Sequence, residues 1–81
     1  MKNIGNILER IDEIKEEMVG YKYRHYKGNT YIVIDIGVHT ETYELMVLYK
    51  NTENNNLLFC RPLNIFFEEI DVNKIRFTKI N

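Results

Sequence analysis

The hydrophobic pattern of this chain changes its period at Gly20, and that change constrains the fold more than any other feature. Before Gly20, apolar residues recur every three or four positions, which is the spacing of one face of an α-helix. They are Ile4, Ile7, Leu8, Ile11, Ile14 and Met18. After Gly20, apolar and polar residues alternate, as on a strand with one buried face. The sequence therefore predicts an amphipathic helix over residues 1–19 and a β-rich region over residues 20–81, together forming a single domain.

The predicted helix has residues suited to both of its ends. The side chain of Asn3 can accept a hydrogen bond as an N-cap, and Gly20 can adopt a positive φ just past the last turn. The outer face carries like charges four residues apart, which weaken an isolated helix. These acidic residues are Glu9, Asp12, Glu13, Glu16 and Glu17. The apolar stripe is therefore expected to dock on the domain's own sheet or on its twin in a homodimer, with a separate protein partner as a further alternative.

Short strands are predicted over most of the remaining chain, because β-branched and aromatic residues alternate with polar ones between turn residues. The predicted strands are 21–26, 30–38, 43–50, 57–61, 68–72 and 75–80, with a hairpin tip at 51–56 and a short helical turn at 63–67. The fold is expected to be mainly β, and α+β overall: a small SH3-like antiparallel barrel of five to six strands with the helix packed against it. The alternative is an open antiparallel sheet covered on one face by that helix.

The second predicted strand also has an expected orientation. Strict alternation puts on one face Ile32, Ile34, Ile36 and Val38. Gly37 is expected to mark a bulge or a sharp bend, because glycine inside a strand often does so.

The charges of the chain nearly balance, with 11 basic and 12 acidic residues and a net charge of −1. No global positive field then attracts nucleic acid or an anionic membrane, so neither is expected as a partner. The single cysteine, Cys60, cannot form an internal disulfide. Acidic residues interrupt the N-terminal apolar stripe too often for a signal peptide or a membrane span. The sequence therefore predicts a cytoplasmic protein.

Three polar motifs follow the ends of apolar runs and hold both histidines of the chain. They are Tyr-Arg-His-Tyr-Lys-Gly at 23–28, His-Thr-Glu-Thr at 39–42 and Arg-Pro-Leu at 61–63. Their order and spacing resemble the small bacterial family called domain of unknown function 1653. The resemblance covers about residues 20–72. It departs from the family's pattern at 58–60, where a tryptophan is common, and in the Asn-rich tip. It implies a family and no reaction.

A metal or catalytic centre would need the strand ends to converge. His25, His39, Glu41 and Cys60 are the available ligands, and no motif such as CxxC or HExxH holds them at ligand spacing. We therefore expect no cofactor, and we expect each histidine to end a strand and to bond a neighbouring backbone group or carboxylate. Cys60 follows Phe59 in an apolar run, and we expect it to pack as a small hydrophobe rather than to act as a nucleophile.

The candidate ligand-binding residues come from the three motifs. They are Arg24, His25, His39, Glu41, Glu44 and Arg61. The fork of donors on Arg61 suits a carboxylate or a phosphate, so it is expected either to pair with Glu41 or Glu44 or to contact a ligand that they share. The sequence predicts a binding or accessory module for a small anionic ligand, a peptide or a protein partner. The alternative is a small enzyme that uses His25 or His39 as an acid–base group or a metal ligand.

Overall fold

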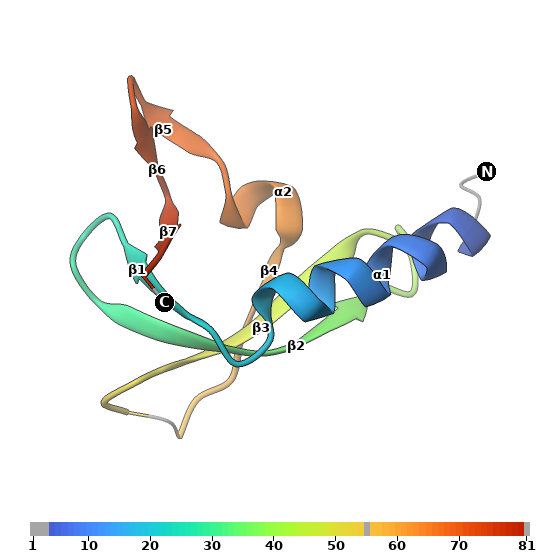
Figure 1. The fold of residues 1–81 in the computed structure, drawn as a ribbon, viewed down its shortest axis with the longest axis horizontal. Coiled ribbons are helices and arrows are strands. Elements are labelled where there is room, and N and C mark those ends of the chain that lie inside the picture. The colour runs from blue at the N-terminus through green and yellow to red at the C-terminus, as the bar shows by residue number, and fades with distance from the viewer. Residues whose placement is uncertain (1–3, 55, 81) are drawn as a thin grey trace.

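The computed structural model describes residues 4–54 and 56–80, with side chains from residue 9 onward. Its elements are α1 (Ile4–Met18), β1 (Lys22–His25), β2 (Thr30–Val38), β3 (Leu45–Asn51), β4 (Phe59–Pro62), α2 (Leu63–Phe66), β5 (Glu69–Asp71), β6 (Lys74–Ile75) and β7 (Phe77–Lys79) (Figure 1). The predicted helix and strands are therefore present, although the last predicted strand is divided at Arg76. The N-cap predicted at Asn3 and the side chains of Ile4, Ile7 and Leu8 lie outside this description.

Five strands form one antiparallel sheet in the order β4-β3-β2-β1-β7, and β5 pairs with β6 in a separate hairpin. The described sheet has β4 and β7 at its two edges and is not closed, so the expected SH3-like barrel is not confirmed, whereas a mainly antiparallel β architecture with an N-terminal helix is. The chain between the two edge strands explains the open seam. Pro62 ends β4 because it lacks a backbone N–H, and α2 and the β5–β6 hairpin then lie between β4 and β7 (Figure 1).

A β-bulge in β2 sets which side chains face the core. Val33 pairs with Tyr49 and Ile36 pairs with Val47, so three steps along β2 correspond to two along β3. The extra residue between Val33 and Asp35 is Ile34. A bulge of one residue reverses the alternation of faces, and Val33 and Ile36 are consequently both buried.

The orientation predicted for this strand is therefore wrong in its first half. Ile34 was expected to share a face with Ile36, but it is 41% exposed and Ile36 is 2% exposed. Gly37, where a bulge or a sharp bend was expected, lies in the regular part of the ladder opposite Met46. Sequence periodicity did not reveal the bulge, because Ile and Val suit either face equally well.

The core is built mainly from aromatic and β-branched side chains. Its buried members are Met18, Tyr23, Val33, Ile36, Val47, Tyr49, Phe66 and Phe77. Phe66 of α2 is fully buried, and its ring stacks on that of Phe77 at 4.0 Å between centroids and 1° between planes. Phe66 also meets Tyr23 and Tyr49 edge-on, at 5.3 and 5.4 Å. The ring of Phe66 thus joins α2 to strands from both halves of the sheet.

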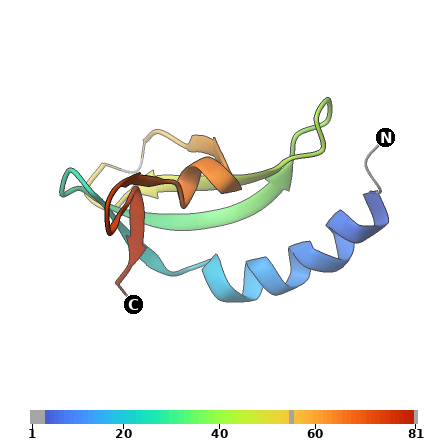
Figure 2. The same cartoon turned by 90° about the horizontal axis from the view of Figure 1, so that it is seen from above.

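The helix α1 docks on the domain's own sheet, as the first of the sequence alternatives expects. Met18 is buried in the core, and Ile11, Ile14 and Val19 pack against it. Figure 2 shows α1 running along one side of the sheet. The backbone N–H of Gly20, whose φ is +84°, donates to the carbonyl of Val33 at 2.8 Å and joins the helix end to β2.

An ion pair also links α1 to the bulged part of β2. Lys15 Nζ lies 3.3 Å from the Asp35 carboxylate. The N–H of Ile36 and then Lys15 lower the pKa of Asp35. Both side chains are largely exposed, so this pair adds little beside the apolar contact of the helix.

We expect Met18→Ala to lower the free energy of unfolding by about 2–4 kcal/mol, because it leaves a cavity between α1 and the sheet. Urea denaturation followed by circular dichroism measures the change. Glu16→Ala, on the exposed face of the same helix, is the control and should stay within about 0.5 kcal/mol of the wild type. Equal losses in the two variants would contradict the docking of α1.

Two neighbouring phenylalanines allow a matched test of the core. Phe66→Ala should cost about 3–5 kcal/mol of unfolding free energy, because a fully buried ring is removed. Phe67 is 42% exposed, and Phe67→Ala should cost less than half as much. The midpoints of urea denaturation compare the two, and a larger loss for Phe67→Ala would overturn the central place given to Phe66.

Candidate functional site

The structure places the two histidines at opposite ends of β2. His25 ends β1 beside the start of β2, and His39 follows the end of β2. A strand of nine residues spans about 25–30 Å, so the two imidazoles do not belong to one site. Five of the six candidate residues are therefore divided, with Arg24 and His25 at one end of the sheet and His39, Glu41 and Glu44 at the other.

The His39 end is a hydrogen-bonded turn. Nδ1 of His39 accepts hydrogen bonds from the backbone N–H groups of Glu41 at 3.2 Å and Thr42 at 3.3 Å. The N–H of His39 donates to the carbonyl of Glu44 at 2.8 Å and closes the turn. The expectation that this histidine bonds neighbouring backbone groups is confirmed.

His25 bonds its own turn in the same way, but its surroundings are different. Its Nδ1 accepts a hydrogen bond from the N–H of Lys27 at 3.2 Å, so the neutral ring carries its proton on Nε2. The ring lies 4.5 Å from the ring of Tyr26 and meets Phe77 edge-on at 4.9 Å. Burial, and then the positive charges of Arg61, Arg76 and Lys27, lower the pKa of His25. The electrostatic potential around this imidazole is therefore positive.

Arg61 is half-buried, and its side chain reaches the end of the sheet that holds His25. Its guanidinium carbon lies 5.8 Å from the centroid of the Phe77 ring. It also lies beside the hydroxyl of Tyr49: burial raises the pKa of Tyr49, and the charge and hydrogen bonding of Arg61 oppose that rise. Within the described residues Arg61 forms no ion pair with Glu41 or Glu44. The salt bridge expected from the sequence is therefore absent there, because the Arg61 side chain extends over the aromatic core.

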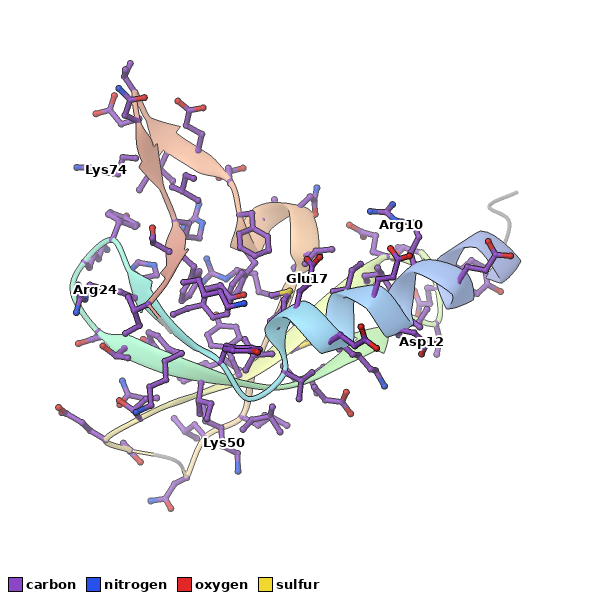
Figure 3. All side chains as sticks on the ribbon, in the orientation of Figure 1. Arg10, Asp12, Glu17, Arg24, Lys50 and Lys74 are labelled. Carbon is purple, nitrogen blue, oxygen red and sulfur yellow. The ribbon has the colours of Figure 1, made fainter. Side chains whose placement is uncertain are left out.

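A groove of about 340 Å³ opens between the β1–β7 edge of the sheet and the β5–β6 hairpin. Arg24, His25 and Tyr26 line it from the side of β1, and Lys74 and Ile75 line it from β6. Figure 3 shows Arg24 and Lys74 on the same side of the molecule, at the end opposite to Arg10. The groove lining holds no carboxylate within the described residues.

Lys74 and Arg76 are the functional candidates that sequence reasoning missed. Both lie outside the three polar motifs: Lys74 is in the predicted connection between the last two strands, and Arg76 is within the last predicted strand. Arg76 donates from Nε to the carbonyl of Ile65 at 3.2 Å and pairs with Glu68 at 2.8 Å. No pattern in the sequence could have placed Lys74 in the groove that His25 lines, or Arg76 near the imidazole, because the hairpin returns to β1 only in the folded chain.

The side chain of Cys60 does not lie where the sequence predicted. Cys60 lies in β4, an edge strand, and its side chain is exposed rather than packed as a small hydrophobe.

No group of three or more His, Cys, Asp or Glu side chains in the described part of the chain is arranged to hold a metal ion. Of the described helices, none is long and apolar enough to cross a membrane.

A second hollow, of about 420 Å³, lies between α1 and α2. Its walls are largely the apolar side chains that dock α1, such as Ile14, Met18 and Leu63. Lys79 closes one side by donating from Nζ to the carbonyl of Glu17 at 2.6 Å. This hollow therefore belongs to the packing of the helix.

The fold and the groove define a small antiparallel β protein with a cationic hollow beside an edge strand. Residues 21–79 match the model of the family described as "Protein of unknown function (DUF1653)", and the chain belongs to that family. The match begins after α1, so the helix lies outside it. No curated protein matches the chain, and no solved structure does.

The field around His25 can be tested by titration. We expect nuclear magnetic resonance of the ring protons to give a pKa for His25 below about 6.5, the unperturbed value. At a pH between the pKa of His25 in the folded protein and its pKa in the unfolded chain, the unfolded state binds more protons. The stability that His25 contributes is therefore present above about pH 6.5 and is lost as the pH falls through its pKa in the folded protein.

Arg61→Met should raise the pKa of His25, because it removes a positive charge and keeps an unbranched side chain near Phe77. Arg10→Met, on the exposed part of α1, is the matched control and should leave that pKa unchanged. If both variants leave it unchanged, Arg61 does not contribute to the field at His25.

Proposed function

We propose that this protein is a binding module whose ligand is anionic and occupies the groove between β1, β7 and the β5–β6 hairpin. The observation that carries the proposal is the composition of the groove: Arg24 and Lys74 line it from opposite sides, and no described carboxylate lines it. Two cations facing a hollow without acidic partners favour a carboxylate or phosphate ligand there.

The residues behind the groove support the same ligand class. Arg61 and Arg76 both raise the positive potential at His25, and only Arg76 has an acidic partner. The neutral imidazole has a donor on Nε2, and a bound anion would raise the pKa of His25 toward protonation. Binding is therefore expected to take up protons and to strengthen as the pH falls from about 7 toward the pKa of His25.

The other candidate residues have different roles in this proposal. Arg24 and His25 contact the ligand, and Arg61 adds charge from behind them. His39 holds the β2–β3 turn through its hydrogen bonds, with Glu41 and Glu44 in the same turn and outside the groove lining. The exposed thiol of Cys60 fits a reducing compartment, which supports a cytoplasmic location.

Tripolyphosphate is a suitable probe of this proposal, because it carries several negative charges and no aromatic group. We expect it to shift backbone amide resonances of β1, β6 and β7 in a two-dimensional nuclear magnetic resonance titration. The double variant Arg24→Met with Lys74→Met should weaken binding at least about tenfold, since two charge-assisted contacts are lost. Arg10→Met is the control and should bind as the wild type does. Shifts spread evenly over the surface, or unchanged in the double variant, would contradict the proposal.

A further inference from the structure

The charges of this protein are segregated, although its net charge is close to zero. The helix α1 and residues 35–44 carry eight acidic and two basic residues. The other described residues carry eight basic and four acidic ones. Figures 1 and 2 show the β2–β3 turn near the N-terminal half of α1, and the β1–β2 turn and the hairpin at the opposite end. The part of the chain that forms the groove is therefore basic as a whole, which the net charge of −1 conceals, and three of its four acidic residues, Glu68, Glu69 and Asp71, lie in or just before the β5–β6 hairpin.

An exposed aromatic ring lies among the cations of this groove. Tyr26 lines it and is 41% exposed, and the imidazole of His25 lies beside it with 33° between the ring planes. Lys27 Nζ is 5.8 Å from the Tyr26 centroid. A simple phosphate needs only the cations. An exposed aromatic face beside cations suits a ligand that has both phosphates and flat rings.

We propose that the groove binds single-stranded nucleic acid, with phosphates on Arg24 and Lys74 and a base stacked on Tyr26. This inference rests on the proposed function and names the class of its anion. A single strand is required because the bases of a duplex are stacked on one another and offer no free face. The neighbouring strand β5 carries the exposed Glu69 and Asp71, which would repel a broad anionic surface such as a duplex or a membrane.

This partner departs from the sequence expectation, which excluded nucleic acid on net charge alone. The relevant quantity is the number of phosphates that the groove contacts. With Arg24 and Lys74 each contacting one phosphate, affinity should fall with salt at a logarithmic slope of about −1.4. Raising the salt from about 50 to 200 mM should then weaken binding roughly sevenfold.

Fluorescence anisotropy with labelled oligo(dT) and oligo(U) of about ten nucleotides tests the inference in the full chain. We expect dissociation constants on the order of 10 μM at physiological salt, as for binding without sequence preference. Tyr26→Ala should weaken oligonucleotide binding about fivefold or more, and Tyr26→Phe should retain it, because phenylalanine keeps the stacking surface. Tyr26→Ala should leave tripolyphosphate binding within about twofold of the wild type. The double variant Arg24→Met with Lys74→Met should weaken the binding of both kinds of ligand, and Arg10→Met should weaken the binding of neither.

The outcomes separate this inference from the proposed function. Binding of tripolyphosphate without binding of either oligonucleotide would overturn the inference and leave the proposed function intact. Failure of all three ligands would overturn both. An oligonucleotide affinity that is unchanged by Tyr26→Ala would also overturn the inference, as would a duplex that binds as tightly as the single strand. Loss of affinity on Tyr26→Ala with either oligonucleotide supports it.

Discussion

The stack of Phe66 on Phe77 is the contact on which the rest of the structure depends. Phe66 comes from α2 and Phe77 from β7, and their parallel rings lie 4.0 Å apart. β7 has only three residues and pairs with β1 alone, so its ladder would be weak without this apolar anchor. Tyr23, Tyr31 and Tyr49 surround the stacked pair edge-on and join it to β1, β2 and β3.

The same stack positions the groove. Because β7 is held against β1, the preceding hairpin must leave the sheet at Arg76. The backbone N–H of Arg76 donates to the carbonyl of Glu68, and the carbonyl of Arg76 accepts from the N–H of Tyr26. The hairpin then faces the turn after β1 across the groove. Arg61 extends over the ring of Phe77 and away from the β2–β3 turn. Packing of aromatic rings thus decides where the cations of this protein gather.

Charge placement is the property that best connects the fold with function. Like charges that are far apart in the sequence, such as Arg24 and Lys74, come together at one end, and the acidic face of α1 lies along another part of the surface. A protein with almost no net charge can therefore still place two cations on the lining of one groove. Burial, and then the charges of Arg61, Arg76 and Lys27, lower the pKa of His25 at this end.

The sequence by itself determined the local structure. The spacing of Ile11, Ile14 and Met18 specified a helix that docks, and Gly20 ended it with a positive φ. The three polar motifs specified the family and the turns that the histidines hold. These features depend on residues close to one another in the chain, and short-range sterics and hydrogen bonds are sufficient to define them.

Only the tertiary structure decided the bulge at Ile34, the open seam between β4 and β7, and the placement of Lys74 and His25 in the lining of one groove. Each depends on contacts between segments distant in the chain. An isoleucine suits either face of a strand, and an arginine suits either an acidic partner or an aromatic ring. The choice between such alternatives is made by packing energy over the whole core, which no local pattern encodes.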